Sequence, residues 1–514
     1  MEKYSVVREG KRMKYQRVFK SKTYLALILG ATTTLAMTSQ TAEATGNRVW
    51  TLGGMNRFVE DDANRWLYPH TISNYSNLFY LEMFGLGDSV GAVAPGSLRS
   101  AQNTEAFLAS DFQAIQGSAA GGAIIQLMDG AFLSLHLSDY ENDAVKSFLE
   151  DTFAPFAGGD PSAIGWIPSN PPPGLEGANR KLDLMAAYDV VPDFLSVGLA
   201  LSFGSSAYLY NPNDNDPPLY EGTDDEVSRA TDNLGTSETR VLLSAGIDVS
   251  EAITAEVGFG FANHGLTYLP NNNGELISGG SGTELQLDAR AMMGISEKWE
   301  LVPAISFRSL NFKAIDLSDL ASGLSYNNTA PERDQTRQST VELASSVFDL
   351  GVAGHYKPVE YVDFWLAAGM SIGSRQTSVI HFEAEDPGAS PPIVRDLPLE
   401  EDISTDGMIA LPYIKSGIEA RVFSWLDLRA GVVKYVVSNK TTVSQIDDQA
   451  NDSNRNNDTT ADDPFFDYFL GMAAHYEGFF LDLQLDPEWI RRGPNFLSGA
   501  SGNMFLNASL GYKF

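Results

Sequence analysis

The sequence predicts an all-β fold, a transmembrane antiparallel β-barrel of 16 strands in the outer membrane of a Gram-negative bacterium. Three observations support this prediction: segments in which every second residue is apolar, connections that alternate between short and long, and a last segment that ends on an aromatic residue. A strand points successive side chains to opposite faces, so each such segment has one apolar and one polar face. Outer-membrane barrels turn the apolar face to lipid and the polar face to the lumen. Several weakly alternating segments leave 14 strands as the alternative.

Residues 1–44 have the features of a secretory signal peptide. Eight basic residues precede an apolar run over residues 24–37, and Ala42, Glu43 and Ala44 form the small-residue pattern of a cleavage site. This run is shorter than the roughly 20 residues that a spanning helix needs. We therefore expect cleavage after Ala44, with an uncleaved anchor helix as the alternative.

The composition narrows the classes of function. The mean hydropathy is −0.15, and no later apolar run is long enough for a spanning helix, so membrane spans would have to be strands with one polar face. The formal net charge of −31 argues against a nucleic-acid partner, whose phosphates it would repel. With 0 cysteines the chain has no disulfide, no thiolate nucleophile and no cysteine metal site.

The alternating segments and their connections predict the barrel in detail. The clearest segments are residues 195–203, 240–248, 253–261, 285–295, 362–372, 414–422, 466–476 and 504–514, with a first strand near residues 78–84 and a pair flanking Asp129 and Gly130. Short turns are expected at residues 128–130, 190–193, 249–252, 296–298, 357–360, 423–425 and 477–478. Long loops are expected at residues 139–180, 205–239, 267–283, 314–342, 376–406, 438–463 and 486–503. Short turns face the periplasm and long loops face outward in such barrels.

The last segment, residues 504–514, is predicted to be the closing strand. Leu510, Tyr512 and the terminal Phe514 lie on its apolar face, and we expect them to be the signal that the barrel assembly machinery recognises. The expected partners are therefore outer-membrane lipid and that machinery.

Two of the long loops are rich in Asp, Asn, Pro and Gly, at residues 211–226 and 447–463. Carboxylate and amide oxygens suit calcium, but no ordered spacing of ligands appears, and a solvated loop is the favoured interpretation. We expect no metal site. Residues 143–153 could form a short amphipathic helix over the mouth of the barrel.

Residues 45–75 precede the barrel, which is predicted to span residues 76–514. This segment has no long alternating pattern, yet it contains Trp50, Phe58, Trp66, Leu67 and Tyr68. A disordered tail would have few aromatic residues. We therefore expect the segment to pack inside the barrel and to plug the lumen.

The sequence LGGMNRFVEDDANRWLYPHTI in this segment is similar to the start of the outer-membrane long-chain fatty acid transporter family. The matching positions are Gly53, Gly54, Asp61, Asp62, Ala63, Leu67 and Pro69. The chain departs from the family at Tyr68 and His70, where the family has Asn and Ala, and a secretion-associated barrel family shares the acidic pair. Residues 182–203 also resemble the hairpins of the transporter family. The resemblance implies a hatch inside the barrel and passive uptake of hydrophobic small molecules such as long-chain fatty acids.

Charged residues fall on the faces of the strands that are predicted to line the lumen. They include Arg240, Asp288, Arg290, Arg308, Asp363, Glu419, Arg421 and Arg429. They could line a pathway, or they could form a network that holds barrel and hatch together, since buried charges need partners. The network is the favoured interpretation.

No enzyme is expected. Ser134 and His136 share a strand face, but neighbours two apart on a strand lie roughly 7 Å apart, which is too far for a nucleophile and its base. No nucleophile elbow, zinc-binding helix or phosphate loop is present, and no cofactor is expected. The alternatives to uptake are a structural or secretion-partner barrel without transport, and a general porin.

Overall fold

The structure is a computed structural model that describes residues 46–83, 119–138, 180–210, 232–269, 278–315, 338–382, 384–386, 393–394, 400–447, 455–485 and 505–514. The predicted signal peptide, the possible helix at residues 143–153 and the acidic loop at residues 211–226 lie outside these residues.

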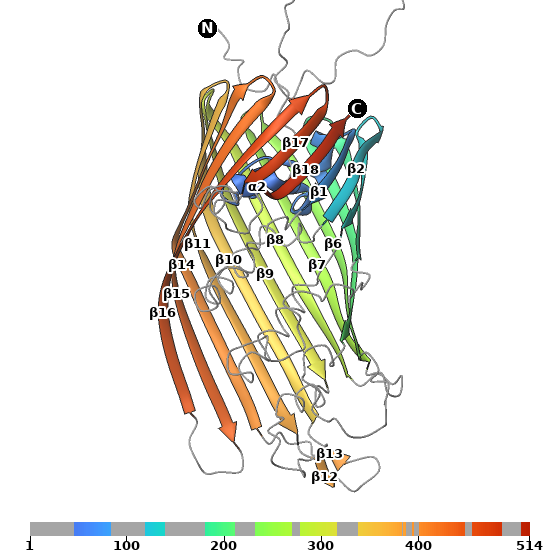
Figure 1. Cartoon of the computed structure of the whole chain (residues 1–514), viewed down its shortest axis with the longest axis vertical. Helices are drawn as coiled ribbons and strands as arrows, with labels where there is room; N and C mark the ends of the chain where they lie inside the picture. Colours follow the sequence, from blue (N-terminus) through green and yellow to red (C-terminus); the bar gives the residue numbers. More distant parts are fainter. Residues whose placement is uncertain are drawn as a thin grey trace, which may run out of the picture.

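Sixteen antiparallel strands form a closed barrel, which confirms the predicted fold and rules out 14 strands. They are β1 (Leu78–Met83), β2 (Ala119–Met128), β3 (Ala131–Ser138), β4 (Arg180–Val191), β5 (Leu195–Tyr210), β6 (Asp232–Ser250), β7 (Ile253–Leu269), β8 (Ser278–Ser296), β9 (Trp299–Ile315), β10 (Gln338–Val359), β11 (Val362–Phe382), β14 (Glu400–Phe423), β15 (Leu426–Asp447), β16 (Arg455–Tyr476), β17 (Phe479–Leu485) and β18 (Phe505–Lys513). Each strand pairs with its neighbours in sequence, and β1 closes the barrel by pairing with β18 (Figure 1). Two further strands, β12 (Ala384–Asp386) and β13 (Ile393–Val394), form a separate small sheet.

The short turns lie where the sequence predicts them. The turn between β16 and β17 consists of Glu477 and Gly478, which both have a positive φ, of 47° and 87°. Two successive positive φ values match the right-handed twist of a hairpin, and this is why such turns favour glycine. Short turns face the periplasm in outer-membrane barrels, so we call this end of the barrel its periplasmic end.

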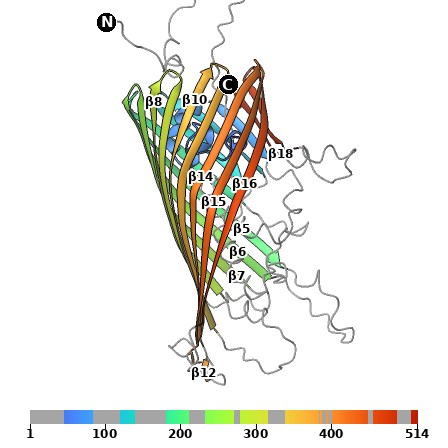
Figure 2. The same ribbon diagram turned by 90° about the vertical axis from the view of Figure 1, so that its left-hand side faces the viewer.

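The predicted loop boundaries are wrong at several outer ends, because many strands continue far beyond the alternating segments. Strand β14 has 24 residues and β10, β15 and β16 have 22 each, whereas about 9–11 cross a bilayer. Residues 376–382, 400–406 and 455–463, expected in loops, belong to β11, β14 and β16. Alternation fails here because a strand beyond the lipid meets water on both faces. The long strands extend well past the short β17, β18 and β1 (Figures 1 and 2).

The two faces of the barrel differ in chemistry. On β11, Leu366 and Ile372 are 50% and 44% exposed and point outward, whereas Trp365 on the same strand is only 4% exposed and points inward. At the seam, Leu510, Tyr512 and Phe514 are exposed on the outside, as predicted for the closing strand. An apolar exterior around a closed barrel is the architecture of bacterial outer-membrane proteins. None of the described helices is long and apolar enough to cross a membrane.

The described residues before β1 form three short helices, α2 (Gly46–Thr51), η1 (Asp62–Trp66) and η2 (Pro69–Tyr75). They lie near the periplasmic end of the barrel, among the strands (blue in Figure 1). Helix α2 contacts β15 to β18, and η2 contacts β2 to β6. We call residues 46–75 the lumenal segment.

Candidate functional site

The lumenal segment is seated on glycines of the barrel wall. A Cβ atom at Gly258 on β7 would collide with the carbonyl oxygen of Leu67, and one at Gly431 on β15 would collide with the backbone nitrogen of Gly53. Other wall glycines in the same position, each beside a residue of the segment, are Gly198, Gly246, Gly417 and Gly471. Only glycine allows one backbone to approach another this closely. The wall is therefore shaped to the segment.

The two glycines of the motif form the turn after α2. Gly53 and Gly54 have φ values of 83° and 69°, and Gly54 donates a hydrogen bond to the carbonyl of Val49 at 3.0 Å. Consecutive positive φ values are strained for residues with a Cβ atom. Lys415 on β14 donates a hydrogen bond to the carbonyl of Gly54 at 2.8 Å, which fixes the turn to the wall.

The acidic pair of the motif organises the segment itself. Asp61 caps η1 by accepting a hydrogen bond from the backbone of Ala63 at 3.0 Å, and it pairs with Arg48 at 3.1 Å. Asp62 pairs with Arg65 at 2.9 Å. Burial raises the pKa of Asp62 to about 6 although Arg65 opposes the shift, and burial also raises the pKa of Asp61. The pair is therefore a structural element of the segment, and its carboxyl groups are protonated more readily than in water.

Arg290 on β8 connects the wall to the segment. It pairs with Glu256 on β7 at 2.6 Å, and it donates to the carbonyls of Arg57 and Val59 at 3.2 and 3.3 Å. Its second terminal nitrogen donates to Asn64 Oδ1 at 2.9 Å. A fully buried guanidinium with donors directed at both partners fixes the middle of the segment.

Arg57 makes the reverse connection, from the segment to the wall. It pairs with Asp349 on β10 at 3.1 Å and lies 3.5 Å from Asp288 on β8. Tyr413 on β14 donates a hydrogen bond to the same oxygen of Asp349 at 3.0 Å. Three strands thus surround one side chain of the segment.

A third group of ion pairs lies beside the closing strand. Arg48 pairs with Glu419 on β14 at 2.7 Å, and Arg429 on β15 joins Glu419 to Asp482 on β17. Asn47 donates a hydrogen bond to Ser509 on β18 at 2.7 Å. The start of the segment therefore contacts the last strands of the barrel.

The other end of the segment contacts the first strands. The guanidinium of Arg65 lies 4.4 Å from the ring centre of Tyr80 on β1, and Trp66 packs edge-on against His136 on β3. His70 donates its backbone N–H to Ser244 on β6 at 2.9 Å, and the preceding Pro69 begins η2. The segment thus contacts both sides of the β1–β18 seam.

The predicted lumen-facing residues fall into three groups. Asp288, Arg290, Glu419 and Arg429 are buried in the contacts just described. Arg240 crosses β7 to bond Glu284 and Gln286 on β8, because β7 has only Gly260 and Ala262 there. The remaining three, Arg308, Asp363 and Arg421, are half-buried. Asp363 pairs with His355, and Arg421 pairs with Asp427, both within the wall.

Several residues at the interface are absent from the sequence prediction. Lys415 and Asp482 lie on inward faces of their strands, and alternation could have identified both. Arg57 and Asn64 lie in a segment without a period, so no pattern marks them. Their partners are distant in sequence.

His70 lies between a serine and a carboxylate: its Nδ1 is 3.0 Å from Ser244 Oγ and its Nε2 is 3.6 Å from Glu256. His136 Nδ1 is hydrogen-bonded to the hydroxyl of Tyr80 at 2.7 Å, and Ser134 Oγ has no hydrogen-bond partner among the described residues. Within the described ranges there is also no group of three or more His, Asp or Glu side chains that could hold a metal ion.

No protein-family model matches the chain, and no curated protein matches it. Among solved structures the chain is similar to the ferric yersiniabactin uptake receptor FyuA from Yersinia pestis, with 8% identity, a TM-score of 0.34 and 77% of each chain covered. It is also similar to the ferric-catecholate import receptor Fiu from E. coli K12, with 8% identity, a TM-score of 0.34 and coverage of 85% of this chain and 74% of that one. The translocator domain of the autotransporter NalP from Neisseria meningitidis matches 62% of this chain and 89% of its own, with 11% identity and a TM-score of 0.25. These similarities are too distant to identify a ligand.

The barrel and its lumenal segment define what the site can do. The protein is an outer-membrane β-barrel whose described inner wall combines buried ion pairs with a large apolar cluster. Such a surface can bind, orient or exclude a solute.

Proposed function

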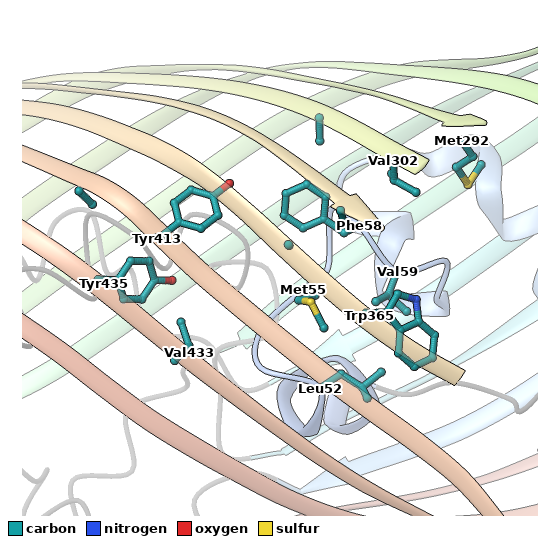
Figure 3. Packing of buried hydrophobic residues seen from close by; sticks show 14 of the residues in the cluster. Leu52, Met55, Phe58, Val59, Met292, Val302, Trp365, Tyr413, Val433 and Tyr435 are labelled. Atoms are coloured by element: carbon teal, nitrogen blue, oxygen red, sulfur yellow. The ribbon is translucent and has the colours of Figure 1, made fainter. Parts of the chain in front are cut away.

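We propose that the barrel mediates passive uptake of hydrophobic small molecules across the outer membrane and that the lumenal segment acts as its hatch. The observation that carries this proposal is an apolar cluster on the inner wall, where outer-membrane barrels are usually polar. Met55 and Phe58 of the segment pack there against Trp365, Tyr413 and Tyr435 (Figure 3).

The apolar wall continues beyond the segment, away from the periplasmic turns. Val437 on β15 lies four residues beyond Val433, and Ala410 on β14 lies beyond Tyr413; all four are buried. On β9 and β10, which β11 separates from β14, Phe312 and Leu343 are inward-facing and buried. A hydrophobic solute would find a favourable surface along these strands down to the hatch.

The resemblance of residues 53–69 to fatty acid transporters supports the same class of function, with long-chain fatty acids or hydrocarbons as substrates. Passive movement of such a solute needs an apolar site and a movable hatch, but no cofactor and no catalytic residue. The glycine-lined wall and the ion pairs of Arg57 and Arg290 would hold the hatch closed between transport events.

Deletion of residues 45–75 tests the proposal in planar lipid bilayers. The intact protein should be nearly closed, and the deletion variant, if it migrates as a folded barrel on unheated gels, should show large conductance. Open-pore conductance of the intact protein would instead identify a general porin.

The second candidate is a structural or secretion-partner barrel without transport. The contacts of Asn47 with Ser509 and of Arg65 with Tyr80 favour it, since they brace a seam in which β1 and β18 share only six residue pairs. A silent deletion variant, together with the absence of any co-purified hydrophobic ligand, would support this candidate.

A further inference from the structure

We infer that residues 53–59 of the hatch fill a ligand site of the barrel wall in the structure described here. We infer further that, when this loop moves away, the site binds an amphiphile with an apolar body and a cationic group. The inference rests on the proposed function, and it specifies the chemistry of the solute that takes the place of these residues. It concerns three side chains of one loop, Met55, Arg57 and Phe58, and the wall that they contact.

The apolar part of the site is the wall that Met55 and Phe58 now cover. Met55 is 0% exposed and Phe58 is 3% exposed, and both belong to the cluster formed with β8 to β11, β14 and β15. Figure 3 shows the ring of Phe58 near Tyr413 and Met55 between Phe58 and Leu52. If the loop moved away, this apolar surface would be uncovered, and a hydrocarbon chain or ring could replace the contacts that it loses.

The polar part of the site is a pair of carboxylates at the edge of the apolar wall. Arg57 lies between Asp288 and Asp349, 3.5 and 3.1 Å away. Asp288 is fully buried; its Oδ2 atom accepts a hydrogen bond from Gln286 at 2.6 Å, whereas its Oδ1 atom, 3.5 Å from Arg57, accepts none. A buried carboxylate oxygen that accepts no hydrogen bond attracts a cation strongly, provided that the cation can approach it more closely than Arg57 does. Arg57 therefore occupies the place of a cationic group without satisfying it completely.

The loop is separable from the rest of the hatch. It begins at the two positive-φ glycines, Gly53 and Gly54, where the backbone has more freedom to change direction. The flanking parts are held by other contacts, Asn47 with Ser509 before the loop and His70 with Ser244 after it. Within the loop, Lys415 bonds the carbonyl of Gly54, and Arg290 bonds those of Arg57 and Val59. The loop leaves the wall only when these bonds break, and both ends of the hatch can remain in place when they do.

The charge of the site decides between classes of amphiphile. With Arg57 displaced, the two carboxylates still exceed the charge of Arg308, which interacts electrostatically with Asp288. The site therefore favours an ammonium or guanidinium group and repels the carboxylate of a fatty acid. The inferred solute therefore has the apolar body that the resemblance implies, but a headgroup of the opposite charge. Within the proposed uptake of hydrophobic molecules, it replaces long-chain fatty acids as the substrate.

Binding of three ligands with the same alkyl chain tests the inference. Dodecylamine, dodecanol and dodecanoate are added in labelled form to the full-length protein in nanodiscs of uncharged lipid, and empty nanodiscs are subtracted. We expect dodecylamine to bind at least about tenfold more tightly than the other two, which corresponds to about 1.4 kcal/mol.

Two substitutions separate the tethered cation from its acceptors. Arg57→Gln removes the competitor and should raise the affinity for dodecylamine about tenfold, since a larger fraction of the site becomes available. In the Arg57→Gln background, where no tethered cation competes for the carboxylates, Asp349→Asn should lower that affinity by a similar factor. Arg421→Gln, which removes a partly exposed arginine paired with Asp427 elsewhere on the wall, is the control and should change neither. Each variant is used only if it shows the mobility of a folded barrel.

The possible failures are distinguishable. Equal affinities for the three ligands, or no response to Arg57→Gln and Asp349→Asn, would overturn the inference and leave the proposed uptake of hydrophobic molecules intact. No binding above empty nanodiscs, including to a Phe58→Ala variant that uncovers the apolar wall, would overturn both.

Discussion

Substitution of Arg290 by methionine should release the hatch from the wall. Methionine retains much of the volume and apolar contact of the arginine stem but donates no hydrogen bond. Arg290 makes two sets of bonds to the hatch: one nitrogen is shared between the carbonyls of Arg57 and Val59, and the other donates to Asn64 at 2.9 Å.

The magnitude follows from these bonds. A hydrogen bond from a charged donor contributes about 1.5 kcal/mol or more, and the shared nitrogen counts as one bond, so the hatch loses about 3 kcal/mol of docking free energy. That loss raises the undocked fraction about a hundredfold, since each 1.4 kcal/mol is about a factor of ten. The substitution also removes the closest partner of Glu256 and leaves His70 at 3.6 Å, which adds to the effect.

Accessibility of one engineered cysteine measures the undocked fraction. The chain has 0 cysteines, so Ala63→Cys supplies a single thiol at a hatch position that is 1% exposed. A maleimide added from the periplasmic side should label this thiol about a hundredfold faster in the Arg290→Met background. Arg421→Met, which affects only a partly exposed pair within the wall, is the matched control. An unchanged labelling rate in a folded Arg290→Met barrel would refute the role assigned to Arg290.

Three further predictions concern the same molecule. Gly258→Val should displace the hatch and speed labelling of the Ala63→Cys thiol, because the new side chain meets the carbonyl of Leu67, whereas Gly279→Val, whose nearest atom is 3.7 Å away, should not; equal rates would contradict the close packing. Because burial raises the pKa of Asp62 to about 6, the docked hatch binds this proton more tightly than the undocked hatch does. Docking is then favoured at low pH and weakens as the pH rises through about 6. Relative to a small free thiol at the same pH, which corrects for the thiolate fraction, labelling should be faster at about pH 7 than at about pH 5, and Asp62→Asn should reduce that difference. Deletion of Phe514 should lower the amount of heat-modifiable folded barrel in the outer membrane, because this exposed aromatic ends the closing strand and donates its backbone N–H to Asn77 at 3.0 Å; normal folded levels would show that the end of the chain is not an assembly signal.

The barrel could be predicted from the sequence because its determinants are local. A strand between lipid and a wet lumen repeats every two residues, and the turns at Gly130 and Gly478 are marked by a residue type that accepts positive φ. These signals identified the strands, the short turns and the even count. They did not identify the outer ends of β14, β15 and β16, since both faces of a strand are solvated beyond the lipid and the period disappears.

The sequence also indicated that residues 45–75 pack against something, because Trp66 and Tyr68 would be costly to expose together in a mobile tail. It could not show against what. In the sequence, Gly258 is simply a small residue within a predicted strand. The structure shows why it must be small: the carbonyl of Leu67 lies where a Cβ atom would be.

The partners of the charged residues were decided by tertiary structure alone. Alternation placed Glu419 and Asp288 on the inner face, but Arg48 and Glu419 are 371 residues apart, and nothing local connects them. Arg57 lies in a segment with no period, and its position between β8 and β10 depends on the closure of the whole barrel around the hatch. Periodicity records which face of a strand meets lipid, whereas an ion pair across a lumen depends on where two distant stretches of chain meet once the barrel is closed.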